Sequence, residues 1–132
     1  MGKRATSRRL AMQAVFQAEQ GGFPINEALS GLFDNDKFLS ETKDFARRLA
    51  RKAHSERERL DAVIKSFLKD WSLERLSGVD LSILRIAILE LEMGETPQNV
   101  VVNEALGLAE KYSSVESIKF INGILGAYLK KS

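Results

Sequence analysis

The sequence predicts an all-α protein of about seven helices packed around one buried central helix. Apolar residues recur every three or four positions through most of the 132 residues, and no segment alternates polar and apolar residues as a β-strand would. Cap residues, glycines and prolines separate the periodic segments. A chain of this length buries roughly two-thirds of its unfolded surface, so we expect a single domain over residues 1–132.

The first predicted helix runs from about Arg4 to Glu19 and ends at Gly21-Gly22. Residues 1–18 contain four cations and no acid, so we expect a basic leader over residues 1–8. A helical wheel predicts a core-facing arc on this helix. The arc consists of Leu10, Ala11, Ala14, Val15 and Ala18.

The next segment predicts three further helices. Asn26 is expected to cap a short helix that ends near Phe33. An amphipathic stretch from about Lys37 to Asp70 is expected to break near His54-Ser55. Its four clustered cations are interpreted as a solvated face, with a second phosphate-contacting patch as the alternative. They are Arg47, Arg48, Arg51 and Lys52.

The central helix is predicted to run from about Gly78 to Met93. Ser77 is expected to cap it, and Asp80 to reach back in a capping-box arrangement. Ten of the fifteen residues from 79 to 93 are apolar, and a helix that is apolar on most sides is usually buried. Three acids near its end are expected to form a solvated face. They are Glu90, Glu92 and Glu95.

Two more helices complete the predicted fold. Thr96 is expected to cap a helix whose first residue is Pro97 and which ends near Tyr112. Ser113 and Glu116 are expected to form a capping box for the last helix, which runs to about Leu129. Its buried side is predicted to consist of Val115, Ile118, Ile121, Leu125, Tyr128 and Leu129.

Several classes of function are disfavoured by composition. The chain has no cysteine, which excludes disulfides and thiol chemistry. The single histidine, His54, has no evident nucleophile or carboxylate partner and is interpreted as a surface residue. We find no metal-ligand spacing and no cofactor motif, no apolar run of ~18 residues and no secretory signal. We therefore expect a cytoplasmic, non-catalytic protein without metal or cofactor.

A strip on the first helix suits single-stranded RNA. Arg9, Gln13 and Phe16 fall within about 60° of one another at the edge of the buried arc. A guanidinium holds phosphate, an amide reads a base edge and an aromatic ring stacks a base. The alternative is that Phe16 is an ordinary core residue at the boundary of the arc.

An aromatic residue on the last helix also lies outside its buried side. Phe120 shares a face with Glu116 and Gly123, near Lys119, and needs a second helix or a ligand to cover it. Packing against another helix is the alternative. Tyr112, just before the last helix, is open to the same two interpretations.

Four segments resemble the NusB family of bacterial transcription antitermination factors. They are residues 8–16 (RRLAMQAVF), 76–91 (LSGVDLSILRIAILEL), 97–105 (PQNVVVNEA) and 119–125 (KFINGIL). They occur in the family's order over most of the chain, whereas residues 21–70 match only in length and helical character. The resemblance implies the all-helical NusB fold.

The resemblance also implies a function on ribosomal RNA operons. In that family NusB pairs with NusE, a small-subunit ribosomal protein, and the pair binds the boxA element of the nascent transcript within an RNA polymerase antitermination complex. The implied partner contact is Asp80. The implied RNA contacts are Arg4, Arg8, Arg9, Gln13, Phe16, Tyr112, Glu116, Lys119 and Phe120.

The chain departs from the family pattern in two places. Ala5 and Thr6 interrupt a basic run that is often unbroken, and Phe16 replaces a frequent tyrosine. The family includes monomers and dimers, so a homodimer contact near the first helix is an alternative use of this surface. The net charge of only +2 also allows a protein-interaction module that does not touch RNA. The RNA-binding domain of some ribosomal RNA methyltransferases is a third possibility, but the end of the chain at Ser132, without a cofactor-binding half, argues against it.

Overall fold

The computed structural model describes residues 3–69, 73 and 76–131, and in this part of the chain the only long elements are α-helices. The all-α prediction of about seven helices is confirmed. The helices are α1 (Lys3–Gly21), α2 (Ile25–Phe33), α3 (Ser40–Ser55), α4 (Arg57–Lys65), α5 (Gly78–Met93), α6 (Gln98–Tyr112) and α7 (Val115–Lys131).

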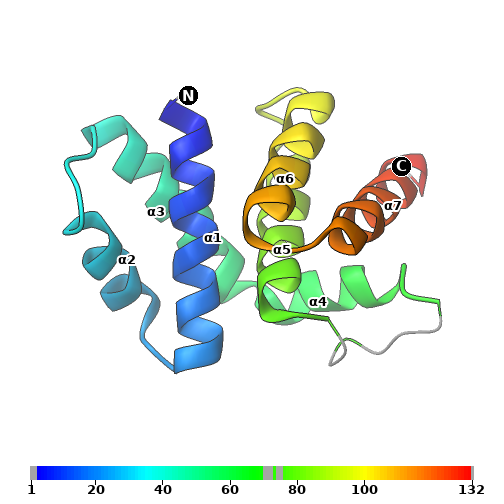
Figure 1. Ribbon diagram of the computed structural model, residues 1–132, viewed down its shortest axis with the longest axis horizontal. Helices are drawn as coiled ribbons and strands as arrows, with labels where there is room; N and C mark the ends of the chain where they lie inside the picture. Colours follow the sequence, from blue (N-terminus) through cyan, green and yellow to red (C-terminus); the bar gives the residue numbers. More distant parts are fainter. Residues whose placement is uncertain (1–2, 70–72, 74–75, 132) are drawn as a thin grey trace.

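The helices form two groups that meet where α1 packs on α5 (Figure 1). Helix α1 also packs on α2 and α3, while α5 packs on α4, α6 and α7. The prediction of a buried central helix is confirmed for α5, since every residue from Ser82 to Glu90 is buried. Helix α1 is a second hub, and its predicted arc of apolar residues is buried as expected.

Several helix ends lie where the sequence placed them. Ser77 caps α5, because its Oγ accepts a hydrogen bond from the backbone N of Asp80 at 3.0 Å. Gly94 ends α5 in the left-handed conformation with φ of 67°, which costs glycine little. The break between α3 and α4 falls at Glu56, next to the predicted position. The predicted end of this stretch at Asp70 lies outside the described residues.

The predicted caps of α2 and α6 are wrong. Pro24 and Pro97 occupy the N-cap positions, each in an extended conformation that offers no side-chain cap. Asn26 lies inside α2, where its Oδ1 accepts a hydrogen bond from Arg51 Nε at 2.8 Å. In both cases the fixed φ of proline sets the entry to the helix, so no capping side chain is needed.

The start of α7 also differs from the prediction by one residue. Ser114 is the cap, since its Oγ accepts a hydrogen bond from the backbone N of Ser117 at 3.1 Å. The predicted capping box of Ser113 and Glu116 is therefore wrong. Val115 stands in the first turn and is 70% exposed, so its assignment to the buried side is also wrong.

Candidate nucleic-acid interface

Two hollows lie beside α1, and Tyr112, the last residue of α6, lines both of them. The first, here called the cationic hollow, has a volume of about 310 Å³. Its polar lining residues are Thr6, Arg8, Arg9, Glu104, Lys111 and Tyr112. The second, the apolar hollow, has a volume of about 290 Å³. It is lined by Met12, Gln13, Phe16, Gln17, Leu32, Val79 and Tyr112.

The structure brings the predicted strip on α1 together with Tyr112. Gln13 and Phe16 are half-buried and form a wall of the apolar hollow, with Tyr112 also in its lining. Phe16 is supported from behind by the close backbone of Gly78, where an added Cβ would lie 3.0 Å from the ring. Aromatic faces beside an amide are the surroundings that RNA-binding domains offer an unstacked base.

Arg9 retains a positive charge that no described carboxylate neutralises. Its Nη1 donates a hydrogen bond to Gln13 Oε1 at 3.3 Å, and no ion pair in the described part of the chain includes Arg9. It lines the cationic hollow next to Tyr112. This arrangement can hold a phosphate beside an aromatic face.

Arg4 lies apart from this group. Its guanidinium lies over the Phe45 ring, 3.8 Å from the centroid, and it lines a third hollow between α1 and α3. That hollow also contains Glu41, Asp44 and Arg48. Because α1 turns about 100° per residue, Arg4 and Gln13 fall on opposite sides of the helix. The structure therefore does not join Arg4 to the strip at Arg9.

Arg8 is buried, with 5% of its surface exposed. Its Nε and Nη2 donate to the two carboxylate oxygens of Glu90 at 2.7 and 2.6 Å, and its Nη1 donates to Glu104 Oε1 at 3.0 Å. Burial alone would lower the pKa of Arg8, but the hydrogen bonds and charges of Glu90 and Glu104 raise it. The prediction that Glu90 lies on a solvated face is wrong, since it is 1% exposed.

Asp80, the implied partner contact, is 7% exposed. Its carboxylate accepts hydrogen bonds from Ser113 Oγ at 2.7 Å and from Ser117 Oγ at 2.6 Å. The predicted capping box of α5 is thus only half correct: Ser77 caps the helix, whereas the Asp80 side chain ties the start of α5 to the turn between α6 and α7. This bond network fixes the turn that follows Tyr112.

The predicted contacts at the start of α7 lie outside the two hollows. Glu116 and Lys119 are both exposed. Phe120 is half-buried and packs against the hydrophobic core, so part of its ring is covered by the protein itself. The structure therefore gives Phe120 a packing role, and leaves the rest of its surface accessible.

Lys111 is a further residue of the cationic hollow that was not among the predicted contacts. This exposed residue lines the cationic hollow, with its Nζ 5.6 Å from the centroid of the Tyr112 ring. Glu104, Leu108 and Lys111 follow one another at spacings of four and three residues, so a helical wheel of residues 98–112 would have grouped them.

A second buried ion pair, centred on Arg85, was not predicted from the sequence. Arg85 in α5 donates from Nε and Nη2 to the Asp61 carboxylate, both at 2.7 Å, and from Nη2 to Glu19 at 2.9 Å. His54 lies nearby and is half-buried, not a fully solvated surface residue as predicted. Burial, followed by the charge of Arg57, lowers the pKa of His54. The described residues contain no cluster of three or more histidine or acidic side chains suited to a metal.

Comparison with known proteins identifies the family. Residues 5–130 match the model of the NusB family. The chain belongs to the NusB family. The transcription antitermination protein NusB of Clostridium botulinum (strain Loch Maree) is 40% identical over 136 residues, which cover 93% of this chain and 96% of that protein. The four motifs that predicted NusB thus pointed to the correct family.

Solved NusB structures share the fold over nearly the whole chain. T. maritima NusB superposes with a TM-score of 0.89 at 32% identity, covering 98% of this chain and 92% of that one. The structure of antitermination factors NusB and NusE in complex with dsRNA gives a TM-score of 0.91 at 25% identity, covering 100% and 99%. Among the described residues of this NusB-family chain, no helix is long and apolar enough to cross a membrane.

Proposed function

We propose that this chain is a non-catalytic transcription antitermination factor that binds RNA and pairs with the ribosomal protein NusE. Family membership supports the antitermination role, and a structural relative is found with NusE and RNA. The observation that carries the RNA-binding role in this chain is the grouping of Arg9, Gln13, Phe16 and Tyr112 around two adjoining hollows.

The two hollows suit different parts of a nucleotide, one the phosphate and the other the base. Arg9 and Lys111 supply positive charge for the phosphate backbone, a contribution that does not depend on base sequence. Phe16 and Tyr112 offer aromatic faces to bases, and Gln13 offers both a donor and an acceptor to a base edge. This division suits single-stranded RNA of the boxA type, whose unpaired bases can leave the stack.

The protein acts in the cytoplasm as an adaptor within the RNA polymerase antitermination complex. The whole chain serves as one RNA-binding domain. Glu116 and Lys119, together with the accessible part of Phe120, extend the RNA surface along the start of α7. NusE docks next to the turn that Asp80 holds in place.

Titration of a labelled boxA-type RNA with this protein, alone and with NusE, at two salt concentrations tests the proposal. We expect binding that tightens with NusE and weakens with salt. Arg9→Ala should reduce the log–log salt slope by about 0.7, the value for one phosphate contact on a single strand. Arg47→Ala is the matched control, since Arg47 is exposed and already paired with Asp44 at 2.9 Å.

Three outcomes would contradict the proposal in different ways. A folded protein that binds no RNA, with or without NusE, is a protein-docking module only. Equal effects of Arg9→Ala and Arg47→Ala would mean that binding is diffuse and that the hollows have no special part in it. A protein that dimerises through α1 and loses RNA binding on dimerising would make this surface an oligomer contact.

A further inference from the structure

We propose that Arg8 is a positioning residue of the RNA-binding surface and not one of its phosphate contacts. It holds the first turns of α1 on α5 and α6 and keeps Glu104 away from the cations of the hollow. The effect on RNA rests on the proposed function, whereas the anchoring of α1 is measurable without RNA.

The donors of Arg8 are already committed inside the protein. Nε, Nη1 and Nη2 each donate to a carboxylate oxygen, and the pair with Glu90 is bidentate. A phosphate that took over this guanidinium would leave the Glu90 carboxylate, which is 1% exposed, buried without its counter-ion. Binding of an RNA phosphate therefore costs less free energy at Arg9 than at Arg8. Arg9 is half-buried and has no carboxylate partner in the described structure.

The charge around Arg8 also argues against a phosphate contact. Two carboxylates, those of Glu90 and Glu104, surround one guanidinium, so the cluster carries a net formal charge of −1. Such a cluster does not attract a phosphate. The attraction of the cationic hollow comes from Arg9 and Lys111, which line the same space.

Arg8 instead holds the two sides of the cationic hollow together. The hollow has α1 on one side and α6 on the other, and the bond from Arg8 to Glu104 joins the two helices directly. The Glu104 side chain is 33% exposed and lines the hollow. If Arg8 did not hold it, this carboxylate would be available to pair with Arg9 or Lys111 and so to compete with RNA.

Glu90→Gln tests this inference because it weakens the bidentate pair but leaves Arg8 in place. We expect RNA affinity to fall by about three- to tenfold, the size of a coupling within one ion-pair network, with an unchanged salt slope. Hydrogen exchange of the amides of residues 5–12 should become faster in the free protein. Glu92→Gln is the matched control, because Glu92 lies two residues further along α5 in an exposed pair with Arg59 and should change neither quantity.

The opposite results are distinct. If Arg8 contacts phosphate, Glu90→Gln removes the carboxylate that competes for its guanidinium, and RNA affinity rises instead of falling. If the pair serves stability alone, the melting temperature falls while affinity stays the same. Either result overturns the inference. If the wild-type protein binds no RNA, the proposed function fails alone, and unchanged hydrogen exchange in Glu90→Gln would then refute the anchoring as well.

A triple variant covers the case in which Glu90→Gln does not fold. Arg8→Met with Glu90→Leu replaces the buried pair by apolar side chains of similar size, a change that proteins often tolerate. Glu104→Gln in the same chain removes the carboxylate that would otherwise compete for Arg9 and Lys111. We expect this variant to bind RNA with the wild-type salt slope. A slope smaller by about 0.7 would show that a phosphate contact had been removed, and would refute the inference.

Discussion

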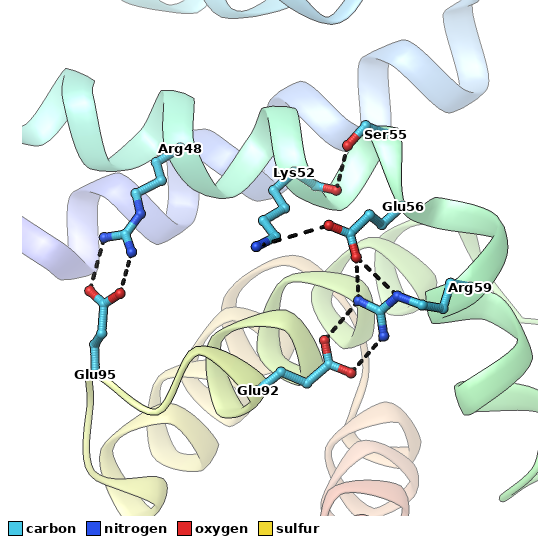
Figure 2. A network of polar contacts seen from close by, with 7 residues as sticks. All are labelled: Arg48, Lys52, Ser55, Glu56, Arg59, Glu92 and Glu95. Atoms are coloured by element: carbon cyan, nitrogen blue, oxygen red, sulfur yellow. Dashed lines mark hydrogen bonds and ion pairs between the residues drawn. The ribbon is translucent and has the colours of Figure 1, made fainter.

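Two basic segments of this chain, the start of α1 and residues 47–52 of α3, have similar composition and different surroundings. In residues 47–52 each of the four cations has a partner: Arg47 pairs with Asp44, Arg48 with Glu95, Arg51 with Asn26 and Lys52 with Glu56. Figure 2 shows Arg48 directed at Glu95, and Glu56 held between Lys52 and Arg59. On α1, the one partner of Arg9 among the residues that the structure describes is the amide of Gln13.

The number of cations in a segment therefore does not by itself locate a phosphate-binding surface. The α3 cations are exposed, yet neighbouring acids and an amide already occupy their donors, so this segment is a solvated, largely neutralised face. The start of α1 contains the same number of cations, but one of them, Arg9, lines a hollow with Lys111 and Tyr112, and no carboxylate among the described residues pairs with it. What matters is the charge that remains after internal pairing.

The sharpest test of the comparison is the stability of Arg8→Ala against Arg48→Ala. Removing Arg8 leaves Glu90 buried without a counter-ion, so the free energy of unfolding should fall by about 3–5 kcal/mol in urea denaturation. Arg48→Ala removes an exposed pair and should leave the unfolding midpoint unchanged. Equal midpoints for the two variants would show that Arg8 is solvated in solution, contrary to its place in the structure.

A second test compares two tyrosines. Tyr112→Leu keeps an apolar side chain but removes the aromatic face shared by the hollows, so RNA binding should weaken by about 1–3 kcal/mol. Tyr128→Leu is the control, since this ring packs edge-on against Phe67 with centroids 6.1 Å apart. It should reduce stability and spare RNA affinity. If both variants bind RNA like the wild type, no base stacks on Tyr112.

The comparison predicts that the α3 segment can be converted into a phosphate-attracting surface. Asp44→Asn with Glu95→Gln removes the acids that pair with Arg47 and Arg48. Non-specific RNA binding should then gain a salt slope steeper by as much as about 1.4, for two added phosphate contacts on a single strand. No change in slope would mean that pairing with these acids is not the reason why Arg47 and Arg48 do not bind phosphate.

The smallest expected effect concerns His54, which follows the α3 cations. Burial lowers its pKa, as do the charges of Arg57 and Arg85, whereas Glu19 opposes them. The unfolded chain then takes up the proton more readily, so the free energy of unfolding should decrease as pH falls below about 6.5. His54→Gln should reduce this dependence in denaturation curves measured between about pH 5 and pH 8. An unchanged pH profile would place His54 in solvent.

Much of the fold was predictable because it depends on local pattern. The helical periods, the cap at Ser77 and the terminating Gly94 all follow from neighbouring residues. The two proline starts and the cap at Ser114 were missed by one or two residues, since several cap signals stand side by side there. Helix boundaries are decided by small differences in local energy.

The candidate site was predictable only in part. The strip of Arg9, Gln13 and Phe16 follows from the helical wheel of one segment, whereas the position of Tyr112 between two hollows depends on how α6 packs against α1. The buried pair of Arg8 and Glu90 joins residues 82 positions apart. Periodicity assigns charged residues to the surface, and only the tertiary fold reveals which of them are paired inside.

The closeness of α1 to the first residue of α5 has an evolutionary consequence. A methyl group at residue 78 would lie 2.5 Å from Gln20 Nε2 and 3.0 Å from Phe16 Cε1, so the ring would have to shift toward the apolar hollow. A side chain gained at position 78 would therefore require Gln20 to move and the Phe16 ring to give way slightly. Such a change would reshape the wall of the apolar hollow from a position that does not line it.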